Sequence, residues 1–189
     1  LDRSRGGRSE RIGPRRPPLD TLITLRPIRP EDRGFLFRVY ASTREEELAL
    51  TDWDEEQKRA FLEGQFAAQD TWYRERYEGA TLDVIEADGV PAGRLYVHRR
   101  EREIRLMDVA LLPEHRGRGI GSALLHDLFA EAAAAGKRVT IHVEEYNPAR
   151  RLYERLGFRK VGEHGVYHLM EWSPPGGGPD AALEPPAAG

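Results

Sequence analysis

Residues 113–122 read Pro113-Glu114-His115-Arg116-Gly117-Arg118-Gly119-Ile120-Gly121-Ser122, and this segment says more about the chain than any other. An apolar, strand-like segment at 104–112 precedes it, and a helical pattern at 122–135 follows it. Glycines allow a tight turn and let the backbone approach a ligand closely. The first turn of a helix offers unpaired N–H groups and a positive dipole end, which suit a phosphate. The segment therefore predicts a phosphate-binding turn between a strand and a helix.

Two common phosphate-binding loops do not match this spacing. A P-loop requires G-x-x-x-x-G-K-[ST], and no Lys-Ser or Lys-Thr pair stands at that distance from a glycine here. A dinucleotide fingerprint requires G-x-G-x-x-G, whereas these glycines fall at 117, 119 and 121. The cofactor is therefore expected to be of another kind.

Arg116-x-x-Gly119-x-Gly121 resembles the Arg/Gln-x-x-Gly-x-Gly/Ala signature of the GCN5-related N-acetyltransferase (GNAT) family, and the resemblance covers about residues 22–172. It implies an α/β (α+β) GNAT-like fold, with a central mixed, mostly antiparallel sheet of about seven strands flanked by about four helices. It also implies acetyl-CoA as cosubstrate, with its pyrophosphate on the backbone of the turn. The predicted cofactor-binding residues of the turn are Arg116, Gly117, Arg118, Gly119, Ile120, Gly121 and Ser122. A glycine-rich turn without a ligand is the alternative.

A second segment, at 147–158, resembles another motif of the family and is matched at Asn147, Tyr153, Gly157 and Phe158. Asn147 is expected to cap a helix that Pro148 begins. In relatives the matching Asn contacts the pantetheine arm, and the matching Tyr lies near the sulfur and can protonate the leaving thiolate. A tyrosine with an ordinary pKa of about 10 is protonated at neutral pH and suits that role. Asn147 and Tyr153 are therefore predicted to bind the cofactor, and Tyr153 to be catalytic; the alternative is that Tyr153 only packs in the core.

The resemblance also gives the strand at 104–112 a role in the reaction. It implies direct attack of an amine on the acetyl thioester in a ternary complex, with a backbone N–H of this strand stabilising the oxyanion. In the family a bulge in this strand spreads the sheet and lets pantetheine pair beside it. Val109, Ala110 and Leu111 are the residues predicted to lie beside the cofactor. Their apolar character equally suits an ordinary buried strand.

The sequence departs from the family at the general base. A Glu is common eight residues before the Pro of the turn, and here that position is Arg105. Asp108 is predicted as the catalytic base, because a carboxylate in an apolar stretch needs a partner or a raised pKa. An ion pair with Arg94 or Arg105 is the equal alternative. Other candidate bases are Glu103, Glu144 and Glu145. A non-catalytic acyl-CoA-binding regulatory domain is the competing function, because the usual base is missing.

The remaining patterns predict a mixed α/β order. Strands are expected at 21–28, 82–87, 93–99, 138–144, 158–161 and 166–172, and helices from residue 30, at 54–68 and at 148–156. One GNAT domain is predicted at 19–172, between a disordered Arg/Pro-rich arm at 1–18 and a disordered Pro/Gly/Ala tail at 173–189.

Composition narrows the class of protein further. The 189 residues include no cysteine, which excludes disulfides, thiolate metal sites and a cysteine nucleophile and is compatible with a cytoplasmic protein. No apolar run is long enough to span a membrane. A net charge of −3 does not indicate nucleic-acid binding, and His164 and His168 alone do not predict a metal site.

The acceptor is expected to be an amine of unknown identity. Acidic residues at 45–47 and 52–56 would attract a cationic amine, although acidic runs are more often simply a solvated surface. A homodimer is left open.

Overall fold

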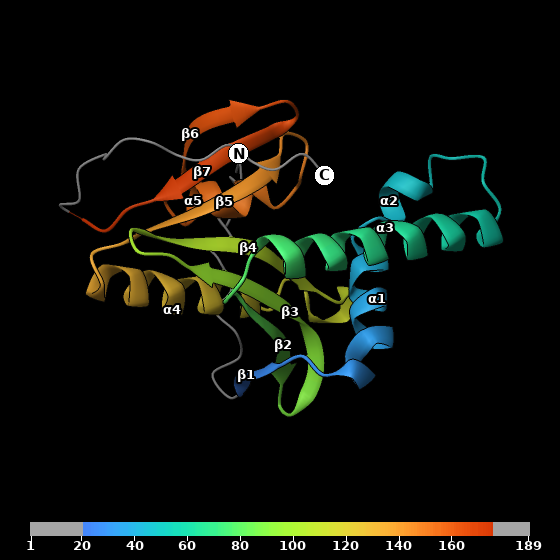
Figure 1. Ribbon diagram of the computed structural model, residues 1–189, viewed down its shortest axis with the longest axis horizontal. Helices are drawn as coiled ribbons and strands as arrows, with labels where there is room; N and C mark the ends of the chain where they lie inside the picture. Colours follow the sequence, from blue (N-terminus) through green and yellow to red (C-terminus); the bar gives the residue numbers. More distant parts are fainter. Residues whose placement is uncertain (1–20, 176–189) are drawn as a thin grey trace, which may run out of the picture.

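A seven-stranded sheet, in the order β1-β2-β3-β4-β5-β7-β6, runs through residues 21–175, the part of the chain that the computed structural model describes (Figure 1). Its strands are β1 (Ile23–Pro27), β2 (Thr81–Ala87), β3 (Val90–Arg99), β4 (Glu103–Leu111), β5 (Arg138–Glu144), β6 (Arg159–His164) and β7 (Tyr167–Trp172). All neighbouring strands are antiparallel except β4 and β5, which are parallel. The prediction of a mixed, mostly antiparallel sheet is confirmed.

Five α-helices lie in the same part of the chain, one more than the sequence predicted. The helices are α1 (Arg33–Ser42), α2 (Glu45–Leu48), α3 (Glu55–Arg76), α4 (Ile120–Ala134) and α5 (Arg150–Arg155), with short 3-10 helices η1 (Pro30–Asp32) and η2 (Pro113–His115). The additional helix is α2, a single turn within the acidic connection. α3 continues to Arg76 instead of ending at Ala68, because its last turns place Tyr73 and Tyr77 against side chains of β3.

The predicted domain boundaries remain predictions. The arm predicted at 1–18 and most of the tail predicted at 173–189 lie outside the described residues. The ordered elements run from Ile23 to Trp172, within the predicted domain.

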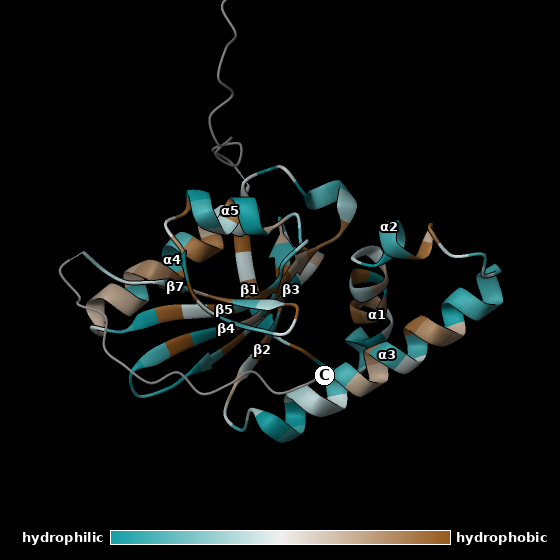
Figure 2. Ribbon diagram, turned by 90° about the horizontal axis from the view of Figure 1, so that it is seen from above, coloured by the Kyte–Doolittle hydropathy of each residue, from teal (hydrophilic) through white to brown (hydrophobic). Residues whose placement is uncertain are grey.

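Helices cover both faces of the sheet, and each face has its own core. α4 packs on β4 and β5, where Ile104, Leu106, Leu125, Val139 and Ile141 belong to the larger apolar cluster. α1 packs on β3 and contacts α3 on the opposite face. A smaller cluster fills that side and includes Phe35, Val39, Tyr40, Phe66 and Val84. Figure 2 shows the sheet between α4 and α5 on one side and α3 on the other.

One residue of β4 is unpaired in the ladder with β3. Tyr96 lies opposite Asp108 and Val97 opposite Leu106, so Met107 is an additional residue in β4. Such a β-bulge bends a strand and shifts the alternation of its side chains. Asp108 therefore lies on the same side as Tyr96, while Val109 packs against the larger core under α4. The bulge expected from the family resemblance is present.

The parallel pairing of β4 with β5 stops at the same place. It joins Glu103–Leu106 of β4 to residues 138–141 of β5 and ends at the pair Leu106 and Ile141. Past this pair, β4 remains paired with β3 and β5 with β7. The ends of β4 and β5 thus separate directly after the bulge.

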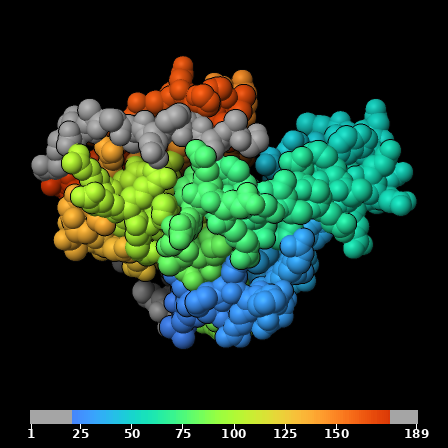
Figure 3. Space-filling model, viewed as in Figure 1, coloured from blue at the N-terminus to red at the C-terminus, as the bar shows by residue number. Residues whose placement is uncertain are grey.

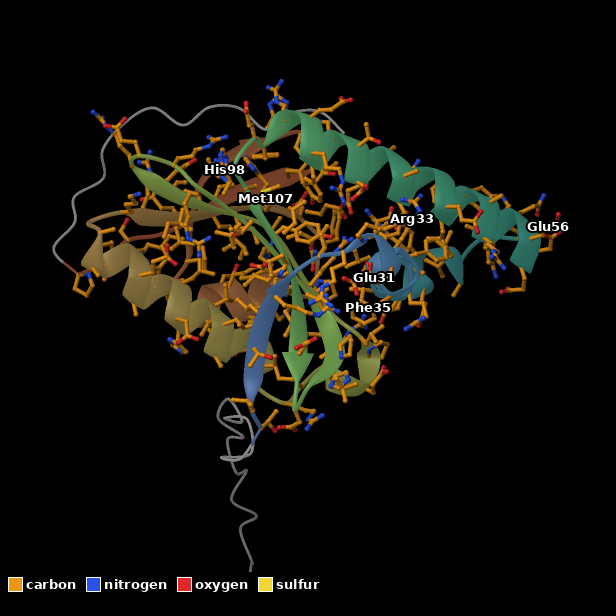
Figure 4. The ribbon with its side chains drawn as sticks, turned by 60° about the horizontal axis from the view of Figure 1, so that its bottom comes forward. Glu31, Arg33, Phe35, Glu56, His98 and Met107 are labelled. Carbon is orange, nitrogen blue, oxygen red and sulfur yellow. The ribbon has the colours of Figure 1, made fainter. Side chains whose placement is uncertain are left out.

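α2 and the N-terminal half of α3 project from the body of the molecule (Figure 3). Phe66 is the buried residue of α3, and its ring packs on those of Phe37 and Tyr40. Further out on the projection, Trp53 and Phe61 contact each other and remain partly exposed. The C-terminal half of α3, in contrast, lies over the sheet near the bulge, where Figure 4 labels His98 and Met107, with Glu56 at the far end of the helix.

A substitution of Gly93 in β3 tests how tightly β3 packs against the end of β4. A Cβ at this position would overlap the carbonyl oxygen of Ala110 and lie 2.8 Å from Cδ2 of Leu111. Gly93→Ala is therefore expected to lower the free energy of unfolding by about 1–3 kcal/mol, measured by urea denaturation. Gly162→Ala in β6 is the control, because its Cβ would make an ordinary contact with Leu169 at 3.8 Å. Equal stability of the two variants would contradict this packing.

Candidate active site

The glycine turn has the geometry of an anion site. Gly117 and Gly119 have φ values of 69° and 81°, in the left-handed region that favours glycine, and Gly119 is the N-cap of α4. No side chain caps the helix, and its first turn holds no acidic residue. The first bond of the helix runs from the Ala123 N–H to the Gly119 carbonyl, so the three preceding N–H groups of the helix have no intrahelical partner. A Cβ on Gly121 would meet nothing within 4 Å. Space and donors for a phosphate are therefore both present.

The side chain of Arg116 stabilises the glycine turn through hydrogen bonds. Its guanidinium donates to the Leu111 carbonyl (2.8 Å), the Ser42 carbonyl (3.1 Å) and the Ser42 hydroxyl (2.8 Å). Its backbone N–H donates to the Pro113 carbonyl (3.1 Å). These contacts join the turn to the end of β4 and the end of α1. A direct contact of Arg116 with pyrophosphate stays a prediction, as do the roles of the neighbouring turn residues.

Tyr153 lies in α5, on the side of the sheet that α4 covers. It is 4% exposed, and its ring packs on Phe158 at a centroid distance of 5.6 Å. Burial raises the pKa of Tyr153 well above its usual value, and the negative charge of Asp108 raises it further. Tyr153 is thus protonated at neutral pH, and it is close enough to Asp108 for the two to interact electrostatically. The roles of these two residues, which were predicted to be catalytic, stay predictions.

Asp108 forms an ion pair with Arg94, one of the two partners considered from the sequence. Nη2 of Arg94 lies 2.5 Å from Oδ2 of Asp108 and also donates to Oε1 of Gln69 in α3 (2.9 Å). Arg94 is 3% exposed, and its guanidinium lies over the rings of Tyr40 and Tyr96. Asp108 is therefore held in place by a fixed cation; its role as base stays a prediction.

Aromatic residues of α3 cover the bulge. The Tyr73 hydroxyl lies 3.4 Å from the carbonyl oxygen of Met107, and its ring meets that of Tyr96 edge to face. Burial raises the pKa of Tyr73 well above its usual value, and Asp108 contributes in the same direction. Tyr77, one turn further, packs on His98. The C-terminal part of α3 thus lies over the bulge, with the phenol of Tyr73 against it.

The remaining candidate bases differ in their surroundings. Glu103 is 6% exposed and accepts from Arg100 (3.1 Å), Arg105 (3.2 Å) and the Thr140 hydroxyl (3.1 Å). A carboxylate enclosed by these three donors leaves little room for a substrate amine to contact it. Glu144 is half-buried between Arg44 and Tyr167, and Glu145 is exposed.

Arg105 and His142 form a partly buried contact that was not predicted from the sequence. Nη1 of Arg105 lies 2.6 Å from Nδ1 of His142, on the neighbouring strand. Burial, and secondly the charge of Arg105, lower the pKa of His142 to about 4. A signal was present in the sequence, because Thr140, His142 and Glu144 are polar residues at every second position of a strand.

The prediction for Asn147 needs a correction. α5 begins at Arg150, two residues later than the predicted start at Pro148. Oδ1 of Asn147 accepts from the Ala149 N–H (2.9 Å), so the side chain closes the turn before the helix instead of capping it directly. Asn147 is exposed, and its contact with pantetheine stays a prediction.

Membrane-spanning and metal-binding features are both missing from residues 21–175. None of the helices there is both long and apolar enough to cross a bilayer. Nor do three or more His, Asp or Glu side chains of this region gather in a way that could hold a metal ion.

The chain is similar to known acetyltransferases in sequence. The model of the acetyltransferase (GNAT) family matches residues 46–158, more than half of the chain. A [ribosomal protein bS18]-alanine N-acetyltransferase of Haemophilus influenzae is 34% identical over 82 residues. That alignment covers 43% of this chain, and it spans about half of the relative, 53% of its length.

Solved structures show the same fold. The PaiA N-acetyltransferase of Thermoplasma acidophilum, solved in complex with coenzyme A, superposes with a TM-score of 0.61 at 18% identity, over 80% of this chain and 99% of that one. An acetyltransferase of Thermus thermophilus gives a TM-score of 0.59 at 22% identity, over 80% and 96% of the two chains. Together with the family match and the bulged, separating strands, these findings confirm the predicted family: the chain belongs to the acetyltransferase (GNAT) family.

Proposed function

We propose that this chain transfers the acetyl group of acetyl-CoA to a primary amine, which attacks the thioester directly. The observation that carries the proposal is the position of the uncapped N-terminus of α4 beside the separated ends of β4 and β5. Membership of an acetyltransferase family supports the same reaction.

The chain offers a continuous set of groups for acetyl-CoA. The backbone N–H groups of residues 117–122 would hold the pyrophosphate, and Arg116 would keep the turn in shape through Leu111 and Ser42. Val109, Ala110 and Leu111 would lie beside the pantetheine arm, because β4 is paired with β3 but not with β5 in this region. Asn147, just after β5, would hold the other side of the arm.

Two residues would move protons during the reaction. Asp108 would take the proton that the acceptor ammonium must lose before its nitrogen can attack. A C–N bond then forms at the thioester carbonyl carbon, with the developing oxyanion stabilised by a backbone N–H of β4. When the C–S bond breaks, Tyr153 would give its proton to the sulfur. The nitrogen, which still carries one proton more than the amide product, would lose that proton to solvent, and the Tyr153 phenolate would take one back from solvent. The raised pKa of Tyr153 keeps the phenol protonated until the sulfur needs the proton.

Among the possible acceptors, we propose the α-amine of a peptide or protein. The Haemophilus influenzae relative is a ribosomal protein alanine N-acetyltransferase, and the region that matches it supports a similar acceptor here. Acidic residues on the projecting part, in α2 and at the start of α3, would favour a basic acceptor.

Release of free thiol from acetyl-CoA, together with calorimetric binding of CoA, tests the proposal. The amines to compare are a peptide that begins with alanine, a lysine side chain in a blocked peptide, and a polyamine. Thiol release that depends on an amine is the expected result. Binding of CoA without turnover on any amine would favour the non-catalytic acyl-CoA-binding alternative, and absence of CoA binding would contradict both functions.

Gly121→Leu tests the anion site. The backbone of Gly121 is ordinary helix with open space beside it, so the folded state should be as stable as the wild type or gain about 0.8 kcal/mol. The side chain would, however, fill the place of the phosphate. CoA affinity should fall about tenfold or more, because each lost hydrogen bond to a charged group contributes about 1.5–3 kcal/mol. Gly64→Leu, at an equally open helical glycine of α3, is the control and should bind CoA normally.

Tyr153→Phe tests the proton donor. The rate constant kcat should fall about 100-fold, within the usual range for removal of a general acid, while CoA affinity stays unchanged. Tyr146→Phe is the control, because Tyr146 is 87% exposed. An unchanged kcat in Tyr153→Phe would mean that water protonates the thiolate.

A further inference from the structure

A largely buried polar cluster joins β4 to β5 at the end of their paired region. It consists of Glu103 and Arg105 on β4 and Thr140 and His142 on β5, and we call it the β4–β5 polar cluster. Nε of Arg105 donates to the Thr140 hydroxyl (2.8 Å), Nη2 donates to Glu103 (3.2 Å), and Nη1 contacts Nδ1 of His142 (2.6 Å). Arg105 is 4% exposed and Thr140 is fully buried. The guanidinium is therefore fixed on three sides.

This arrangement sets the tautomer of His142. A guanidinium has only donors, so Nδ1 of His142 must be the acceptor of the 2.6 Å contact. The lowered pKa keeps the ring neutral at pH 7, and its one proton is then on Nε2. Nε2 is buried and has no hydrogen-bond partner among the described residues. A buried donor without a partner destabilises the folded protein, and a bound molecule that supplied an acceptor would remove this cost.

The position of His142 in the sheet indicates which bound molecule would supply an acceptor to Nε2–H. His142 is the first residue of β5 beyond the last pair with β4, where the two strands separate. Its contacts with Arg105 place it on the face of the sheet opposite α4, and the bulge places Asp108 on that same face. The unpaired donor and the proposed base therefore share the face that α1 and α3 cover, whereas the proposed pyrophosphate site is at the end of α4. His142 as a whole is only partly buried, although its Nε2 atom is enclosed.

We infer that His142 binds the acceptor, by donating a hydrogen bond from Nε2–H to an oxygen on the carbon next to the one that bears the amine. This oxygen is a peptide carbonyl in a peptide acceptor and a carboxylate in a free amino acid. Nε2–H cannot accept a hydrogen bond from an ammonium group, so it recognises the oxygen and not the amine. Arg105 is the positioning residue, because it fixes the tautomer of His142. The inference rests on the proposed function and adds to it the group by which the acceptor is recognised.

The test compares two acceptors that differ in this oxygen. L-alaninamide carries it, and isopropylamine replaces the carboxamide with a methyl group. For each variant, the value of kcat/KM for L-alaninamide is divided by the value for isopropylamine. This ratio is then compared with the ratio of the wild type. The two amines differ in basicity, but that difference is the same in every variant and so cancels in the comparison. His142→Leu should lower the ratio about tenfold through a higher KM for L-alaninamide, with the KM for acetyl-CoA unchanged. His142→Gln, which retains an N–H donor, should restore part of the ratio.

His168→Leu is the matched control. His168 lies opposite Val143, on the neighbouring strand, and should leave the ratio unchanged. An unchanged ratio in His142→Leu would overturn the inference while the proposed function stands, provided that either amine is acetylated. Turnover of L-alanine or of an alanine-initiated peptide in place of L-alaninamide distinguishes the carboxylate from the peptide carbonyl. If no amine is turned over, the proposed function fails and the inference fails with it.

Nitrogen-15 NMR of the His142 ring gives a second readout in the wild-type chain, which does not depend on folding of a variant. The Nε2–H tautomer is expected at pH 7, and Arg105→Lys should increase the other tautomer. A wild-type ring protonated at Nδ1 would overturn the inference.

Discussion

One additional residue in β4, Met107, is the constraint on which the rest of the site depends. A regular strand would place Asp108 on the same side as Leu106, in the apolar core beneath α4. The bulge reverses the alternation, so that Asp108 reaches Arg94 while Val109 stays in the core. It also coincides with the end of the pairing between β4 and β5. A single irregularity therefore coincides with the separation of the strands and moves a carboxylate to the face that α1 and α3 cover.

The charges on that face are arranged in fixed pairs. Arg94 is held by Asp108 and Gln69, and Arg105 by Glu103, Thr140 and His142. Burying charges is costly unless the geometry is good and further hydrogen bonds satisfy each group. All three kinds of nitrogen of Arg105 have a partner, whereas Arg94 makes both of its hydrogen bonds through Nη2 and its buried Nε has no partner among the described residues. The arrangement adds little stability compared with an apolar core, but it fixes side chains on both sides of the place where the strands separate.

The contacts of Arg105 change the interpretation of this position. From the sequence it was a missing base, because a Glu is common there in the family. In the structure it belongs to a largely buried cluster and lies against His142, so the position does not represent a simple loss of function. The feature that favoured a non-catalytic domain is equally compatible with an enzyme that recognises its acceptor differently.

Much of the fold could be predicted from local patterns. The glycine turn, the hairpins and β5, whose bounds at 138–144 match the prediction, depend on neighbouring residues only. The bulge was expected from the resemblance alone, although the sequence carries a direct sign of it. Ile104 and Leu106 are apolar at even positions, whereas Val109 and Leu111 are apolar at odd positions, and such a change of phase requires an additional residue.

Features that depend on tertiary contacts could not be predicted. The length of α3 is set by packing of Tyr73 on Tyr96, which lies far away in the sequence. The choice of Arg94 over Arg105 as partner of Asp108 follows from the register of β3 and β4. The tautomer of His142 follows from the approach of Arg105 across the parallel pair.

Amide hydrogen exchange, followed residue by residue by NMR with and without CoA, tests the central claim most directly. If pantetheine lies beside the separated part of β4, CoA should slow exchange at residues 107–111 and at 117–122, and leave the paired residues 103–106 unchanged. Protection confined to other parts of the chain, with none at 107–111, would contradict the account.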